Sequence, residues 1–282
     1  MLCQCIGQSV FLPLVVSNTI NYDNASLLAV AKLHTADDHT YEHCVATGAL
    51  MYVLAQKLGM GRNEAKEYAL AGLLHDVGKA LMPADILNKP SKLTREEFAT
   101  MREHVAWGLT YLRKCGIRSK IVLEACAHHH ERLDGTGYPH QLKGDAIGLA
   151  ARMCAVCDVY DALTSVRPYK KGWVSGNVIS SMYRQKEQYD PDVLAAFIKI
   201  VGVYPVGTLV RLKSEKLGVV TQTNHVDLLK PKVRIFFDAL SRSRLPVNDI
   251  VCSDGREAVV KTEDPEHWGW GNWSQDWVAY AA

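Results

Sequence analysis

The chain has 282 residues, a length that predicts one large domain together with a small one. Its net charge of +2 excludes a broad basic surface for DNA or RNA, so any anionic ligand must be held by a local cluster of charge. The apolar run 10–16 is interrupted by Pro13 and is too short to cross a bilayer, and we therefore expect no membrane partner.

Eight cysteines are present, and most of them fall in apolar helical stretches, where a free thiol packs as a small hydrophobic group. Cys154 and Cys157 have CxxC spacing, but they lie within a helical run rather than after a strand. We therefore interpret them as core thiols and not as a redox pair. Reduced cysteines predict a cytoplasmic location.

Helical periodicity begins after an N-terminal segment, residues 1–24, which gives only weak signals. A long helix is predicted over 41–58, with Gly59 as its C-terminal cap. Asn63 is expected to cap the next helix, which carries an apolar face and ends near Gly78.

Local capping signals mark the helices that follow. Residues 94–97, Thr-Arg-Glu-Glu, have the pattern of a capping box and open a predicted helix that runs through Leu112. Ser119 opens another helix, which reaches His130. Three more helices are predicted, over 146–163, from Ser175, and from Pro191 with Asp190 as the cap.

The pattern changes after Gly202, where short β-rich runs are separated by turn residues. The predicted strands cover 208–212, 218–222 and 233–237. We place the domain boundary at 203–207, so that a helical domain covers 25–202 and a small β-rich C-terminal subdomain with its tail covers 203–282. The sequence therefore predicts a mainly α fold, a helical bundle with a small β subdomain.

The C-terminal tail carries four tryptophans close together. Such indoles either stack on bases or dock a partner, or they pack back onto the β subdomain. The tail also carries several acids, which are unfavourable near phosphates, so we favour packing. The four residues are Trp268, Trp270, Trp273 and Trp277.

Histidines and acids on the predicted helices are the candidates for chemistry. The dyad of His75 and Asp76 ends an apolar helix, where burial is costly unless the pair is hydrogen-bonded or binds a cation. Further candidates lie on four other predicted helices, and such ligands can converge in a bundle core. They are His43, His104, His129, His130 and Asp158. We expect no cysteine at a ligand position.

Three sequence blocks resemble the hallmark blocks of one known family. They are HDVGK at 75–79, HHERLDGTGYP at 129–139 and DVYDALTSVRPYK at 158–170. In order and spacing they resemble the HD-GYP phosphodiesterases, which belong to the HD superfamily of metal-dependent phosphohydrolases and act on cyclic dinucleotides. The resemblance covers about residues 25–202.

The resemblance implies a helical bundle with a binuclear metal centre. One ion is expected at His43, His75, Asp76 and Asp158. Asp76 would bridge to a second ion, completed by His104, His129 and His130. Two cations about 3.5–4 Å apart acidify a shared water and neutralise the phosphodiester oxygens. The nitrogen and oxygen donors favour iron or manganese, with nickel or zinc as alternatives.

The resemblance also implies which residues meet the substrate. Asp76 and Lys79 are the expected catalytic residues, because Lys79 lies close enough to stabilise charge that develops on a phosphate. The expected substrate contacts are Lys79, Tyr138, Arg167 and Lys170, the last two as a phosphate clamp. Asp161 and Glu131 are expected to orient ligands.

Two positions leave alternatives open. His39 lies one helical turn before His43, so it is either a ligand of a third metal ion or an exposed residue at the helix start. His128 precedes the two expected ligands in a run of three histidines, and a slip of one residue would turn the ligands about 100° round the helix. Register with the following Glu-Arg selects His129 and His130.

The implied activity is hydrolysis of cyclic di-GMP to linear pGpG, and on to GMP. The alternatives are a phosphodiesterase that prefers cyclic GMP-AMP, a catalytically weak receptor for cyclic dinucleotides, and an HD-superfamily nucleotidase. The complete ligand set favours an enzyme over a receptor, and the complete GYP block argues against a nucleotidase. The expected partner is the cyclic dinucleotide, with a homodimer or a signalling protein left open.

Overall fold

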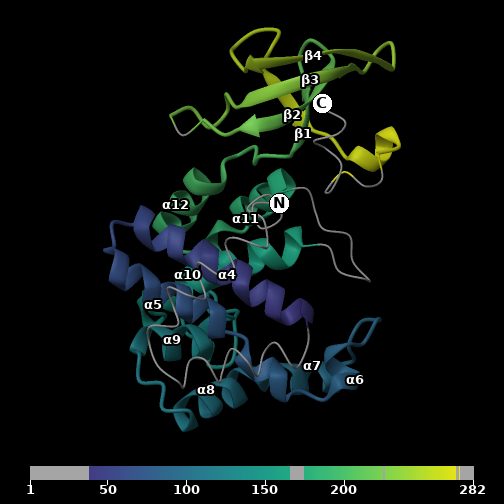
Figure 1. Ribbon diagram of the computed structural model, residues 1–282. Helices are drawn as coiled ribbons and strands as arrows, with labels where there is room; N and C mark the ends of the chain where they lie inside the picture. Colours follow the sequence, from purple (N-terminus) through teal and green to yellow (C-terminus); the bar gives the residue numbers. More distant parts are fainter. Residues whose placement is uncertain (1–37, 166–174, 225, 271–272, 274–282) are drawn as a thin grey trace. The chain divides into compact units, whose positions relative to one another are not determined.

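The computed structural model describes residues 38–165, 175–224, 226–270 and 273 (Figure 1). The chain divides into two compact units, each with its own core. Within the described residues, one unit comprises 38–165 and 185–196, and the other comprises 175–184 and the residues from Phe197 onward. The N-terminal segment lies outside the described residues, and the domain boundary at 203–207 stays a prediction.

The first unit is built from helices that pack pairwise (Figure 1). Helix α4 packs on α5 and α10, and α9 packs on α5, α8 and α10. The elements are α4 (Asp38–Lys57), α5 (Arg62–Leu74), η1 (Val77–Leu81), α6 (Ala84–Leu87), α7 (Arg95–Arg102), α8 (His104–Lys114), α9 (Lys120–His128), η2 (Gly144–Ala146), α10 (Leu149–Thr164) and η3 (Lys186–Gln188). The remaining helices are α11 (Ser175–Arg184), η4 (Pro265–Trp268) and α12 (Pro191–Val201), which crosses from the first unit into the second.

The predicted helix ends are confirmed at several positions. Gly59 ends α4 with a positive φ of 89°, and Thr94 and Glu97 form both bonds of the capping box. Asp190 caps α12 by accepting from the backbone of Asp192 and Val193 at 2.9 Å. These signals are local, and so the sequence contained them.

Two predictions about helices are wrong. Asn63 does not cap α5, because the helix begins earlier and its N-cap is Gly61 in an extended conformation. The helix predicted from the capping box through Leu112 is two helices that meet at Glu103. There the backbone N–H of Glu103 bonds to Thr100 O at 3.0 Å, a tight closure that ends α7. Apolar periodicity continues across this bend and does not reveal it.

Two contacts between glycines bring the helices of the first unit together. A Cβ atom at Gly72 would lie 2.8 Å from the Cα of Gly48, so α4 and α5 cross with their backbones in contact. A Cβ atom at Gly78 would lie 1.8 Å from the carbonyl oxygen of His104, and 2.7 Å from the nitrogen of Gly108. Side chains near these crossings are therefore held at short range from one another.

The second unit contains a five-stranded antiparallel sheet in the order β4-β3-β2-β1-β5. Its strands are β1 (Leu209–Leu212), β2 (Lys216–Gln222), β3 (Lys232–Asp238), β4 (Ser243–Val251) and β5 (Val259–Thr262). The three predicted strands are β1 to β3, and the two edge strands were missed. Strand β4 is almost wholly exposed and contains Pro246, features that hide an edge strand from hydrophobic patterning.

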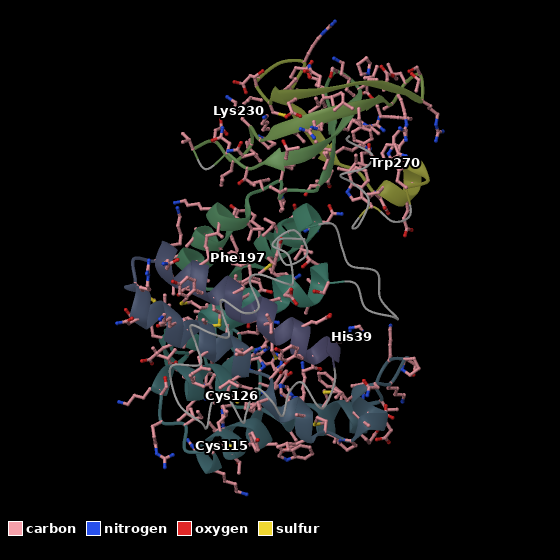
Figure 2. All side chains as sticks on the ribbon, viewed as in Figure 1. His39, Cys115, Cys126, Phe197, Lys230 and Trp270 are labelled. Carbon is pink, nitrogen blue, oxygen red and sulfur yellow. The ribbon has the colours of Figure 1, made fainter. Side chains whose placement is uncertain are left out.

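The tryptophans pack onto the sheet, as the sequence predicts. Trp273 is buried with Leu209, Leu217, Val219 and Phe236, and its indole Nε1 donates to Gly207 O at 2.8 Å. Trp268 packs against the same cluster, and so does Trp270, which is labelled in Figure 2. Trp277 lies outside the described residues.

Cys154 and Cys157 are fully buried free thiols on α10, as expected for core residues. None of the helices in the described ranges combines the length and the apolar character needed to cross a membrane.

Replacement of Gly78 by alanine tests the contact between η1 and α8. We expect Gly78→Ala to lower the free energy of unfolding by about 1–3 kcal/mol or more, because backbone must move to admit the methyl group. Gly61→Ala is the matched control, since a Cβ atom there meets nothing within 4 Å. Denaturant titration of both variants measures the difference, and equal losses would contradict the proposed contact.

Candidate metal centre

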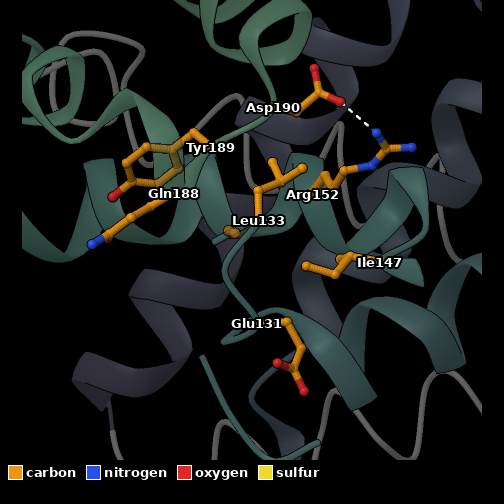
Figure 3. Close-up of a pocket in the computed structure, with 8 residues that line it drawn as sticks. Glu131, Leu133, Ile147, Arg152, Gln188, Tyr189 and Asp190 are labelled. Atoms are coloured by element: carbon orange, nitrogen blue, oxygen red, sulfur yellow. Dashed lines mark hydrogen bonds and ion pairs between the residues drawn. The ribbon is translucent and has the colours of Figure 1, made fainter. Parts of the chain in front are cut away.

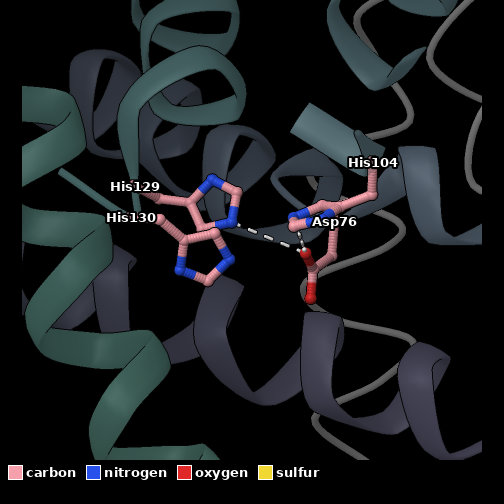
Figure 4. Close-up of side chains that lie close together, drawn as sticks. All are labelled: Asp76, His104, His129 and His130. Carbon is pink, nitrogen blue, oxygen red and sulfur yellow. Dashed lines mark ion pairs between the residues drawn. The ribbon is translucent and has the colours of Figure 1, made fainter. Parts of the chain in front are cut away.

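Five histidines and two aspartates of the first unit meet in two adjoining clusters. We name the first the Asp76 cluster and the second the His43 cluster. The potential ligand atoms within each cluster all lie within 4.8 Å of one another. The Asp76 cluster contains Asp76, His104, His129 and His130 (Figure 4). The His43 cluster contains His43, His75 and Asp158.

The ends of elements supply most of these residues. His75 is the C-cap of α5 and Asp76 the N-cap of η1, so the dyad lies where one helix gives way to the next. His104 is the first residue of α8, and His129 is the C-cap of α9. At such positions side chains can point along the axis into the space between helices.

One ring nitrogen of each of four histidines is held by an oxygen of the protein. His75 Nδ1 lies 2.7 Å from Gly72 O, His104 Nδ1 lies 2.6 Å from Met101 O, and His129 Nδ1 lies 3.0 Å from Ala125 O. His43 Nδ1 lies 2.6 Å from Asp161 Oδ2. Because these oxygens only accept, each Nδ1 carries the hydrogen. The Nε2 atoms of His75, His104 and His129, when neutral, then present lone pairs.

Those lone pairs face a carboxylate. His104 Nε2 and His129 Nε2 lie 3.2 Å and 3.5 Å from Asp76 Oδ1, and His75 Nε2 lies 3.3 Å from Asp76 Oδ2. Within the described residues none of the three Nε2 atoms, nor Asp76 Oδ1, has a hydrogen-bond partner. Acceptors that face one another in a buried space are unfavourable unless a cation lies between them. The donor set therefore fits a metal site.

Electrostatics keep the carboxylates ionised. Burial raises the pKa of Asp76, but the positive charge of Lys79 and the neighbouring histidines together outweigh burial and hold that pKa well below its usual range. Burial also raises the pKa of Asp158, but the hydrogen bond and charge of His43, together with His75 and His130, more than offset burial and hold the pKa of Asp158 well below its usual range. Two buried anions attract cations strongly.

His43 and His130 differ in protonation. Burial lowers the pKa of His43, but hydrogen bonds to Asp158 and Asp161 outweigh it and raise that pKa to about 9. A cation at His43 Nε2 would displace that proton. Burial and the neighbouring His129 ring lower the pKa of His130, which is therefore neutral, as a ligand must be.

The site opens to solvent on one side. The side chains of His75, His104 and His129 are at most 1% exposed, whereas those of His130 and Lys79 are each 20% exposed. Lys79 Nζ donates to Asp76 Oδ2. Burial lowers the pKa of Lys79, but the charges of Asp76 and Asp158 and the hydrogen bond to Asp76 together outweigh burial and raise that pKa, so Lys79 remains cationic.

Tyr138 covers His130 at this opening. The two rings stack with centroids 4.5 Å apart and planes 27° apart. The loop that carries Tyr138 folds tightly against the segment that follows α9, because a Cβ atom at Gly137 would lie 2.4 Å from the nitrogen of Arg132. Only glycine permits that approach.

Glu131 contacts this loop. Its carboxylate, which is fully buried, accepts from His140 N at 2.7 Å and from Leu142 N at 3.0 Å. Glu131 was expected to orient a ligand, and the structure shows instead that it holds the backbone after Tyr138.

Glu131 also lines a small separate pocket in which Arg152 bonds to Asp190 at 2.7 Å (Figure 3). Asp161, by contrast, does contact a candidate ligand, His43.

Other sequence predictions fall outside the clusters. His39 is exposed on the first turn of α4 and belongs to neither cluster (Figure 2). His128 also lies outside both, and its ring faces that of His140 at 5.4 Å. Arg167 and Lys170 lie outside the described residues.

We expected no cysteine at a ligand position, and this stays a prediction, although a third group of potential ligand atoms includes the sulfur of Cys44. Cys44 is fully buried, and its Sγ lies within 4.8 Å of ligand atoms of His75 and Asp76. Burial raises the pKa of this thiol well above its usual range, so Cys44 is a neutral thiol. Its position directly after His43 was the signal that could have found it.

Comparison with known proteins assigns the fold and the site to a class. The sequence profile of the HD domain family matches residues 24–193, which is more than half of the chain. The chain therefore belongs to the HD domain family. The mainly α fold and the resemblance to HD-GYP phosphodiesterases that the sequence predicts are thereby confirmed.

Several proteins that are similar in sequence to this chain are named phosphodiesterases. A cyclic di-GMP phosphodiesterase of Pseudomonas aeruginosa is 46% identical over 271 residues, which cover 95% of this chain and 65% of that protein. A cyclic di-GMP phosphodiesterase response regulator of Xanthomonas campestris is 38% identical over 151 residues, 52% of this chain and 39% of that protein. A 3'3'-cGAMP-specific phosphodiesterase of Vibrio cholerae is 37% identical over 148 residues, 52% of this chain and 28% of that protein. The chain spans less than two thirds of the length of each of these relatives.

Replacement of Glu131 by glutamine tests its hold on the loop. An amide accepts through one atom only, so Glu131→Gln leaves one backbone N–H without an acceptor and costs about 1–3 kcal/mol of stability. We expect faster hydrogen exchange at the amides of 138–142, measured by mass spectrometry. Asp134→Asn is the control, because that carboxylate is more exposed and bonds only within its own turn. Equal exchange in the two variants would contradict the role of Glu131.

Proposed function

We propose that this chain is a metal-dependent phosphodiesterase that opens a cyclic dinucleotide, with cyclic di-GMP hydrolysed to linear pGpG and on to GMP. The observation that carries the proposal is the set of buried Nε2 atoms that face the ionised carboxylate of Asp76 without hydrogen bonds. The names of the relatives from Pseudomonas aeruginosa and Xanthomonas campestris support the substrate.

Two divalent ions would be held by the seven residues of the two clusters. Asp76 is placed to be shared, because Oδ1 faces the rings of His104 and His129 while Oδ2 faces His75. Bound there, the ions would neutralise phosphodiester oxygens and acidify water. Nitrogen and oxygen donors favour iron or manganese, with nickel or zinc as alternatives. A third ion at His39 stays a prediction.

Several side chains around the two clusters favour the binding of an anionic substrate. Lys79 is a partly exposed cation at the opening, where it can contact a phosphate oxygen and stabilise charge that develops on it. The buried rings of His75, His104 and His129 keep water from the inner side of the clusters. Arg167 and Lys170 are proposed to grip a second phosphate, and this role rests on the sequence alone.

Cyclic GMP-AMP is the second candidate substrate. The Vibrio cholerae relative named for it supports this candidate. A receptor without catalysis is less consistent with a donor set in which every expected ligand has a place in a cluster. A homodimer, a signalling partner and a cytoplasmic location stay predictions.

Metal and product analysis together test the proposed function. Protein purified without oxygen is assayed for bound metals and then incubated with cyclic di-GMP or cyclic GMP-AMP, with products separated by chromatography. We expect about two ions per chain and a linear dinucleotide from at least one substrate. Protein that neither retains ions nor hydrolyses either substrate after addition of iron or manganese would refute the proposal.

Replacement of Asp76 should abolish metal binding and catalytic turnover together. We expect Asp76→Ala to lose bound metal and to lower turnover by more than the roughly 100-fold that removal of an outer hydrogen-bond partner costs. A variant that kept its metal and its turnover would show that Asp76 is not shared between ions.

Variants of the neighbouring residues His128 and His129 test which of the two histidines is a metal ligand. His129→Ala removes a ring that faces Asp76, whereas His128→Ala removes one that faces His140. We expect the first variant to retain less metal than the wild type and the second to retain the same amount, by elemental analysis. The reverse result would mean that the register of the ligands is wrong.

A further inference from the structure

Helix α7 presents an aromatic and a cationic side chain beside the opening of the metal centre. None of its residues is buried, yet it carries Phe98, which is 48% exposed, and Arg102 one turn later. Residues four apart lie on the same face of a helix, so these two side chains form one surface. An exposed phenylalanine next to a ligand-binding opening is a contact available to a flat ligand.

This surface continues directly into the metal centre. The guanidinium carbon of Arg102 lies 4.3 Å from the centre of the Tyr138 ring, and the Phe98 ring meets that ring edge-on at 6.4 Å. Tyr138 in turn stacks on His130. Arg102 and Phe98 therefore lie within reach of a ligand whose phosphate is at the Asp76 cluster.

Arg102 has no carboxylate partner in the described parts of the chain. The other cation at the opening, Lys79, is bonded to Asp76, whereas the contact recorded for Arg102 is the face of Tyr138. Stacking uses the flat face of a guanidinium and leaves its N–H groups, which lie in the plane, free to donate.

We propose that Arg102, with Phe98 and Tyr138, forms a base-recognition subsite in which Arg102 selects guanine over adenine. The inference rests on the proposed function, because it names which part of a cyclic dinucleotide this surface meets. A guanidinium only donates, and guanine offers two acceptors, O6 and N7, on one edge. Adenine presents an amino group beside N7, and this hydrogen-bond donor would face the donors of the Arg102 guanidinium.

Substrate preference in Arg102 variants tests this subsite. Metal-loaded wild type, Arg102→Gln and Arg102→Lys are assayed with cyclic di-GMP, cyclic di-AMP and bis(p-nitrophenyl) phosphate, a diester without bases. We expect Arg102→Gln to lower the ratio of kcat/KM for cyclic di-GMP to that for the small diester by about 10-fold, the order that loss of one bidentate pair gives. A glutamine amide pairs with adenine, so discrimination against cyclic di-AMP should narrow. Arg102→Lys should restore charge but only part of the preference.

Arg95→Gln is the matched control. It removes the same charge from the exposed first turn of the same helix, and we expect both ratios to equal those of the wild type. Because each readout is a ratio, a lower fraction of folded protein does not change it. If Arg102→Gln lowered kcat/KM for all three substrates equally, Arg102 would only support Tyr138, and the subsite would be refuted.

Binding separates this proposal from the proposed function. Calorimetric titration of the metal-loaded proteins with phosphorothioate analogues of cyclic di-GMP and cyclic di-AMP, which resist hydrolysis, measures the base preference without turnover. Wild type that binds cyclic di-GMP without hydrolysing it would refute the enzymatic function, while weaker binding by Arg102→Gln would still support the subsite. Equal binding of cyclic di-GMP by both proteins would overturn the subsite whatever the activity, and no binding by the wild type would overturn both proposals.

Discussion

Four histidines of the helical unit each give one ring hydrogen to an oxygen of the protein, and the chemistry of the centre depends on this interaction. It sets the tautomer, and it orients the Nε2 atoms of His75, His104 and His129 towards Asp76. Three of the four oxygens are backbone carbonyls within four residues of the histidine. The helix ends therefore supply the oxygens that orient these three rings, whereas the ring of His43 is held by the side chain of Asp161.

Besides the orientation of the histidine rings, the site requires close approach of the helices, which glycine residues allow. Oriented rings form a site only if their helices approach, and the crossings at Gly72 and Gly78 bring α4 onto α5 and η1 onto α8. The two conditions are coupled, because Gly72 O also holds His75 and the backbone of His104 lies against Gly78. A change in helix spacing would thus alter both the distance and the orientation of the ligands.

The sequence predicted local features well and long-range contacts poorly. A capping box at Thr94 and a Pro191 helix start are decided within a few residues, and both are present in the fold. The break at Glu103 separates α7, which has no buried residue, from α8, which packs on η1 and α9, and the partner of Glu131 depends on where the loop after Tyr138 lies. Cys44 was missed because α4 is buried on more than one side, so a residue next to a ligand also faces inward.

Solvent exposure of the side chains increases from the two clusters towards α7. Buried and exposed residues are therefore suited to contact different parts of a ligand. Asp76 is 1% exposed, His130 is 20% exposed at the opening, and Phe98 on α7 is 48% exposed. With the proposed cations bound, the buried end would admit only a small anionic group, and in a nucleotide that group is the phosphate. Every nucleotide has the same phosphate chemistry, so the buried donors cannot distinguish one base from another. If the ligand is a nucleotide, as proposed, selectivity must therefore come from side chains at the opening, where the guanidinium of Arg102 and the rings of Phe98 and Tyr138 lie together.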